Sequence, residues 1–267
     1  MSDRLKRVFT DAYQMLTGAA IGFALTASYG TMPILTPPSR LVDVHDSVRI
    51  EMQHGSWHPL VRPMDRDLAD RVVGIVKEEL DKYPPGFVSD VCGVNRIVVL
   101  ETALPSLGGL YVGFARRIEV YTHSDGQLSE GSVRATIVHE VDHACNHQNR
   151  TREDVGSWAS LVHDPPSLLE SFVQNHIAPR FEGVDRLPPP PGFAHWYAVS
   201  TARSLIPYRR HKEDEASVKQ LITYGRGVLR ERSDPLLDAK AALLVDRYVR
   251  WSGGVMDDAY FKSWSTR

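Results

Sequence analysis

The chain has 267 residues, of which 42% are hydrophobic and 24% charged, a composition that favours a folded domain with a sizeable core over disorder. Its formal net charge of -2, without a long run of one sign, gives no reason to expect nucleic acid as a partner. The only two cysteines, Cys92 and Cys145, exclude a disulfide-rich scaffold and a cysteine-rich zinc ribbon. We expect both to be buried packing residues, although one disulfide between them stays open.

The N-terminal residues 1–29 allow two interpretations. A basic start, a mostly apolar run over 15–27 and small residues at its end resemble a secretory signal or a membrane anchor. The run is short and carries polar interruptions, which instead suit an N-terminal helix that docks on the core. We therefore expect membrane contact only if residues 1–29 act as an anchor, and the cellular compartment stays open. Residues 30–64 are rich in proline, and we expect an extended arm there.

The remaining residues, 65–267, are expected to form one domain. Apolar residues at helical spacing predict a helix over 66–82, which Pro84 and Pro85 then end. Three runs rich in Val, Ile and Tyr predict a small mixed or antiparallel sheet, over 96–100, 110–115 and 117–122.

Helices dominate the part of the chain that follows these strands. The sequence predicts helices over 129–148, 167–177, 212–230, 235–251 and 257–264. The stretch 149–193 is otherwise expected to be irregular. The fold class is therefore predicted to be α+β, with the sheet packed on an active-site helix and a mostly helical C-terminal half.

The segment that carries chemistry is His139-Glu140-Val141-Asp142-His143, within the helix predicted over 129–148. Two histidines four residues apart project from the same face of a helix, and two neutral imidazoles held in this way make half of a zinc site. A glutamate beside the first histidine can take a proton from a water that zinc activates. This is the His-Glu-x-x-His pattern of zinc peptidases. We expect the strand 117–122 to flank the substrate cleft as an edge strand.

The site needs a third protein ligand. His147 would lie about 12 Å along the helix axis from His139, too far for all three imidazoles to meet one ion. A carboxylate downstream is expected instead, and Glu213 is the favoured candidate because it begins a predicted helix and lies three residues before the small Ala216. Other carboxylates stay open as alternatives: Glu170, Glu215 and Asp154.

These residues resemble the gluzincin metallopeptidases, zincins in which a second helix carries Glu-x-x-Ala followed by an acid or Asn. Here that pattern begins at Glu213 and ends at Ser217, which departs from the family at its last position. The chain looks most similar to bacterial zinc-binding metallopeptidases and to lethal-factor-type proteases, over roughly residues 90–230. The resemblance implies Zn²⁺ as the cofactor, His139, His143 and Glu213 as its ligands, and Tyr208 as a hydrogen-bond donor to the oxyanion.

Three functions follow from this pattern. The first is a zinc metallopeptidase that hydrolyses a peptide or protein substrate with Glu140 as general base. The second is a zinc-dependent amidase that acts on a non-protein substrate. The third is a catalytically silent, metal-stabilised binding module; the presence of Glu140 argues against it, because a purely structural zinc site does not need that glutamate.

Overall fold

The computed structural model describes residues 39–53, 61–62, 65–102, 108–123, 129–162, 189–194 and 211–264. The chain divides into two units, Met1–Pro37 and Pro38–Arg267, and every described residue belongs to the second. Residues 1–29 therefore lie outside the described residues, as does the helix expected over 167–177. Among the described helices, none combines the length and the apolar character that a membrane crossing would need.

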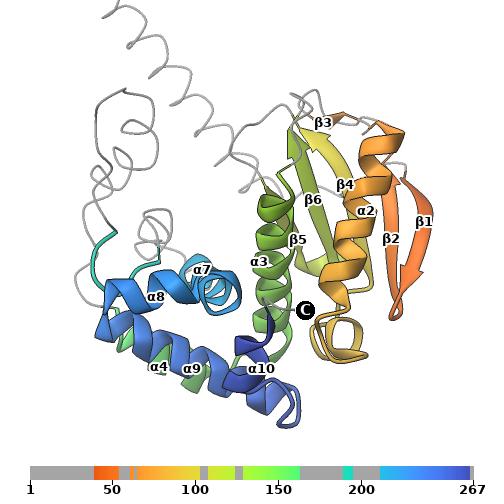
Figure 1. Ribbon diagram of the computed structural model, residues 1–267. Helices are drawn as coiled ribbons and strands as arrows, with labels where there is room; N and C mark the ends of the chain where they lie inside the picture. Colours follow the sequence, from red (N-terminus) through yellow and green to blue (C-terminus); the bar gives the residue numbers. More distant parts are fainter. Residues whose placement is uncertain are drawn as a thin grey trace, which may run out of the picture. The chain divides into compact units, whose positions relative to one another are not determined.

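A six-stranded mixed sheet forms one layer of the domain (Figure 1). Its main order is β1-β2-β4-β6-β5, and β3 pairs with β4. The β2–β4 and β4–β6 pairs are parallel, whereas β1–β2, β3–β4 and β5–β6 are antiparallel. The strands are Ser39–His45, Val48–Gln53, Val61–Arg62, Arg96–Thr102, Gly109–Val112 and Arg117–His123, numbered β1 to β6.

Part of the range that we expected to be an extended arm belongs to this sheet. In β2, Val48, Ile50 and Met52 alternate with polar residues and are buried, so one face of the strand enters the core. The turn between β1 and β2 has Asp46 and Ser47 at φ 44° and 67°, and two consecutive positive φ values are typical of a two-residue hairpin turn. The prolines of 30–64 flank these strands and lie outside the described residues.

The sheet buries one face under two helices, α2 (Arg66–Leu80) and α3 (Glu130–Asn149), which lie side by side in Figure 1. In-register apolar pairs such as Ile50 with Ile97, and Ile97 with Ile118, point into this main core. The helix α2 ends two residues before the expected position. Both helices begin at a side-chain cap, Asp65 for α2 and the predicted Ser129 for α3.

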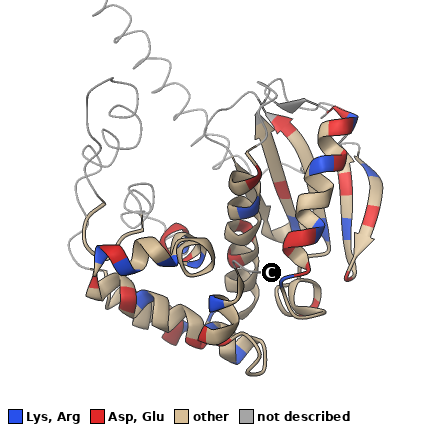
Figure 2. Cartoon of the chain, in the orientation of Figure 1, with Lys and Arg blue, Asp and Glu red and all other residues tan. Residues whose placement is uncertain are grey.

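The C-terminal half is helical, as predicted. It contains α7 (Lys212–Tyr224), α8 (Arg226–Arg232), α9 (Pro235–Trp251) and α10 (Asp258–Lys262). Gly225 separates α7 from α8, where the sequence predicted one continuous helix. The helix α7 packs on α3 and on α9, and both acidic and basic residues occur along these C-terminal helices (Figure 2). The mixed sheet, the central helix and the helical C-terminal half confirm the predicted α+β, zincin-like architecture.

One helix was missed and one strand was misplaced. The helix α4 (Arg152–Ala159) lies in the stretch that we expected to be irregular, and its signal is the capping box from Thr151 to Asp154. The strand β6 was predicted to be an edge strand, and this is wrong: β6 lies between β4 and β5. The short turn over 113–115 reverses the chain, so that β5 covers the outer side of β6 and is itself the edge.

The cysteines form a disulfide, against our expectation of two free packing residues. Cys92 follows the short helical turn η1 (Phe87–Val91), and Cys145 lies in α3. Their separation of 53 residues in the sequence hid this proximity, which arises because η1 packs against α3. The bond ties the helix of the His-Glu-x-x-His segment to the start of β4 at Arg96.

Candidate metal centre

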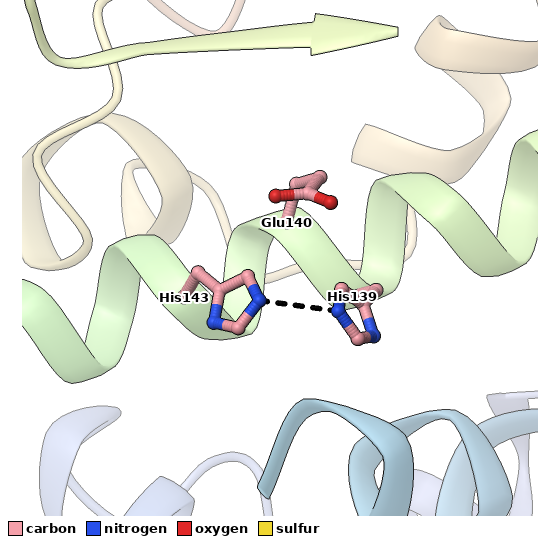
Figure 3. A group of neighbouring side chains, drawn as sticks. All are labelled: His139, Glu140 and His143. Atoms are coloured by element: carbon pink, nitrogen blue, oxygen red, sulfur yellow. Dashed lines mark hydrogen bonds between the residues drawn. The ribbon is translucent and has the colours of Figure 1, made fainter. Parts of the chain in front are cut away.

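The two histidines of the motif lie one turn apart on α3, and their rings project from the same side of the helix (Figure 3). The Nε2 atoms of His139 and His143 are 3.1 Å apart. Each of these side chains is 12% exposed, so both imidazoles reach solvent from an otherwise buried stretch of the helix, residues 137–146. The rest of that segment contributes three apolar side chains to the core, Ile137, Val138 and Val141. The helical period thus explains why the face of the segment that carries His139 and His143 opens outward while the other faces are buried.

Glu213 reaches the same point from α7. One carboxylate oxygen lies 3.0 Å from Nε2 of His139, and the other lies 3.3 Å from Nε2 of His143. Glu213 stands in the first turn of α7, where acidic residues are favoured by the helix dipole. The structure therefore brings together the two predicted histidines and the favoured carboxylate, although 70 residues of sequence separate His143 from Glu213.

The donor set and its spacing fit a zinc ion. Ligand atoms that share one tetrahedral zinc at its usual bond lengths are about 3.3 Å apart. The distances among the His139, His143 and Glu213 atoms run from 3.0 to 3.3 Å. Two imidazole nitrogens and one carboxylate form a donor set that catalytic zinc sites use, with a fourth position left for water. These residues could hold Zn²⁺ without a change of backbone.

Electrostatics bind the three side chains together. Burial by itself would raise the pKa of Glu213, but the adjacent imidazoles hold it well below its ordinary value. For His143 the effects have the opposite sign. Burial by itself would lower its pKa, but the Glu213 carboxylate outweighs this effect and raises that pKa to about 9. The Glu213 carboxylate is therefore ionised at neutral pH, whereas His143 is protonated there, so a cation that binds at this point would displace the proton of His143.

Glu140 lies beside the histidines but projects toward the sheet rather than toward α7 (Figure 3). It is 6% exposed. Burial raises its pKa above the ordinary value, and the opposing effects of His143 and His139 do not cancel this rise. The backbone N–H of Tyr111, on β5, donates a hydrogen bond to its carboxylate. A carboxyl group with a raised pKa next to a candidate metal centre is suited to exchanging protons.

The strand β5 approaches α3 closely at this point, and the sequence analysis did not assign it a role in the site. A Cβ atom added at Gly109 would lie 2.9 Å from Cγ of Glu140 and 2.5 Å from Cγ2 of Thr136. Such contacts are too short for a side chain, so glycine is what allows the strand to pack here. The dipeptide Gly108-Gly109 was the available signal in the sequence for this close approach.

The structure removes two alternative ligands. Asp154 completes the capping box of α4 and pairs with Arg247 and Arg250. Glu215 is completely buried and pairs with Arg150 and Arg247, so it does not face the histidines. Two other predicted residues, Glu170 and Tyr208, lie outside the described residues.

Asp142 lies in the middle of the motif, between Val141 and His143. It is fully buried, and it accepts hydrogen bonds from the Tyr248 hydroxyl at 2.9 Å and from Nδ2 of Asn146 at 2.6 Å. Tyr248 belongs to α9, so this aspartate fastens α3 to the C-terminal helices.

Comparison with known proteins agrees with this architecture. A crystal structure of a provisionally named zinc-binding metallo-peptidase from Bacteroides caccae superposes with a TM-score of 0.52, over 82% of this chain and 84% of that one. The chain shares this fold. Sequence identity is 20%, so the likeness concerns the fold alone. No protein-family model matches the chain, and no curated protein matches it.

Proposed function

We propose that the chain is a zinc-dependent peptidase. The observation that carries this proposal is the convergence of Glu213, from α7, on the His139–His143 pair of α3, at distances that suit one tetrahedral zinc. The fold shared with the Bacteroides caccae protein, which carries the provisional name of a zinc-binding metallo-peptidase, supports it. We assign His139, His143 and Glu213 as the zinc ligands.

Glu140 is the proposed general base. When bound here, zinc would act as a Lewis acid and lower the pKa of a water molecule towards neutrality. Glu140 lies next to both ligating imidazoles, so its carboxylate can take a proton from the attacking water and pass it to the departing amine. The raised pKa of Glu140 means that its carboxylate has a higher proton affinity than an ordinary glutamate. This suits a group that first accepts the proton of the water and then donates it to the amine.

The edge strand β5 is the proposed platform for an extended peptide. In the described part of the chain, β5 pairs with β6 on one side only. The backbone N–H of Tyr111, on β5, donates a hydrogen bond to Glu140, so this strand borders the candidate centre. A peptide could add to this edge by main-chain hydrogen bonds. We thus assign to β5 the role of edge strand beside the substrate cleft that was predicted for residues 117–122.

Hydrolysis of a mixed peptide library by the zinc-loaded full chain tests the proposal. We expect cleavage that a chelator abolishes, zinc restores, and Glu140→Gln reduces by about 100-fold or more. The Glu140→Gln protein should still bind zinc, because Glu140 is not a proposed ligand. Zinc-dependent hydrolysis of small non-peptide amides, with no cleavage in the library, would instead support the amidase alternative. Zinc binding without hydrolysis of either kind would point to the silent binding module.

A further inference from the structure

Glu215 lies two residues after Glu213 on α7, but its side chain enters the protein interior. It is 0% exposed. Its Oε1 atom lies 2.9 Å from Nη2 of Arg150 and 3.1 Å from Nη1 of Arg247. Arg150 is the C-cap residue of α3, and Arg247 belongs to α9. One buried carboxylate thus joins the helix that carries both histidines, the helix that carries Glu213, and a third helix behind them.

A second polar contact joins α3 and α7 on the other side of the histidines. The amide Nε2 of Gln220 donates a hydrogen bond of 2.8 Å to the backbone oxygen of Ala135. Along α3, Ala135 comes before His139, and Arg150 comes after His143. The two contacts therefore bracket the histidine pair. Contacts at two separated points fix the rotation of α7 about its axis as well as its spacing from α3.

A buried ionic cluster such as this one adds little to the stability of the fold by itself. Removing charges from water is expensive, and well-packed apolar residues of similar volume often give equal or greater stability. Here Arg247 also lies 3.3 Å from Oδ1 of Asp154, so the cluster extends to α4. What paired charges supply that apolar residues do not is a strong attraction between two specified atoms, here Oε1 of Glu215 and Nη2 of Arg150 at 2.9 Å, which fixes the spacing of α7 from α3. A catalytic metal needs such a fixed spacing, because its ligands must meet within a few tenths of an ångström.

We propose that Glu215 is a positioning residue for the metal centre. Through Arg150, it holds α7 at the spacing and rotation that place the Glu213 carboxylate opposite His139 and His143. Glu215 touches neither the ligand atoms nor the substrate edge, and it acts through the backbone of α7. The proposal rests on the proposed zinc site, and it adds a residue that determines how tightly that site closes.

The test compares zinc affinity with stability in the full-length protein. Glu215→Gln keeps the shape of the side chain but removes its charge. The matched control is Glu119→Gln, which breaks a buried pair, Glu119 with Arg117, whose two members both lie on β6 and on neither α3 nor α7. A double variant, Arg150→Met with Glu215→Met, replaces this pair by apolar side chains and removes the charge of Arg150 that Glu215→Gln leaves unpaired, while Arg247 keeps Asp154 as its partner.

Zinc affinity is measured by competition with a chromophoric chelator, and ligand geometry by the visible absorption spectrum of the Co²⁺-substituted protein. We expect Glu215→Gln and the double variant to bind zinc roughly 10 to 100 times more weakly than wild type and to show a changed Co²⁺ spectrum. Glu119→Gln should lose stability with wild-type affinity and spectrum. The double variant should recover stability without recovering affinity.

Wild-type affinity and spectrum in a folded Glu215→Gln or double variant would overturn the positioning role. So would an equal loss of zinc affinity in Glu119→Gln, because affinity would then follow general stability. Failure of the proposed function is distinguishable, since in that case wild type itself takes up no zinc and no variant can be ranked against it.

Discussion

Gly109 and Glu140 are in contact across the boundary between β5 and α3. A Cβ atom at Gly109 would lie 2.9 Å from Cγ of Glu140, closer than side-chain atoms pack. This contact places the edge strand beside the proposed general base. It also makes a single methyl group a sensitive probe of the site.

Gly109→Ala should push β5 away from α3. We expect a loss of about 2 kcal/mol in the free energy of unfolding, because overpacking forces the backbone to shift. Peptidase kcat/KM should fall as well, since Glu140 loses its place against the strand. Gly131→Ala is the control: it lies in α3 with nothing within 4 Å of the added Cβ, and it should be neutral or stabilising by up to about 1 kcal/mol. Similar stability and activity in the two variants would contradict this account of the contact.

The disulfide between Cys92 and Cys145 should supply much of the stability of the domain. It spans 53 residues of sequence, and closing a loop of that length in the unfolded chain corresponds to about 4 kcal/mol. Replacing both cysteines by alanine should lower the free energy of unfolding by an amount of this order, measured by urea titration. The double variant should then be insensitive to reductant, whereas wild type should lose stability when reduced. Equal stability of oxidised and reduced wild type would show that the bond contributes nothing.

The disulfide also makes a prediction about the cellular compartment in which the protein folds. Structural disulfides persist mainly in oxidising compartments. We therefore expect complete oxidation after export and incomplete oxidation in a reducing cytoplasm. Thiol titration of unfolded protein from each compartment would measure this difference.

Asp154 predicts how stability depends on pH. Burial by itself would raise its pKa, but hydrogen bonds from Thr151 and Arg250 hold that pKa below its ordinary value. Because the pKa is lower in the folded state, the ionised carboxylate stabilises the fold above its unfolded-state pKa, and this contribution is lost as pH falls through the folded-state pKa.

Asp154→Asn should therefore cost about 3 kcal/mol near neutral pH, where it removes one of the two carboxylates that pair with the buried Arg247 and leaves Glu215 as the other. The difference between variant and wild type should shrink as the pH is lowered below about 4. Denaturant titrations across this range provide the measurement. A difference that stays constant with pH would mean that the charge of Asp154 does not contribute.

Local patterns were enough to predict the part of the site that lies on α3. His139, Glu140 and His143 depend on helical period alone, and that period can be read from the flanking apolar residues. The position of Glu213 was also predicted, because acidic residues at a helix start and a small Ala216 suggested a close-packed second helix. In the structure its carboxylate oxygens lie 3.0 and 3.3 Å from Nε2 of His139 and His143, and its role as a ligand stays a prediction.

Features that depend on distant pairing could not be predicted in this way. Strand order is one: the sequence of β5 and β6 does not say which of them is the edge. The partners of Glu215 are another, because Arg150 and Arg247 come from helices that only the tertiary fold brings together. The pairing of Cys92 with Cys145 belongs to the same class. By contrast, the alternation in β2 and the capping box of α4 were visible locally and were overlooked.

Zinc content tests the central claim most directly. Purified full-length protein, supplied with zinc and then dialysed against a weak chelator, is analysed for bound metal beside His143→Ala and Glu213→Gln. We predict about one zinc ion per wild-type chain, none in His143→Ala, and a strongly reduced content in Glu213→Gln. Wild type that takes up no zinc would contradict the account. Full retention in Glu213→Gln would show that Glu213 is not the third ligand.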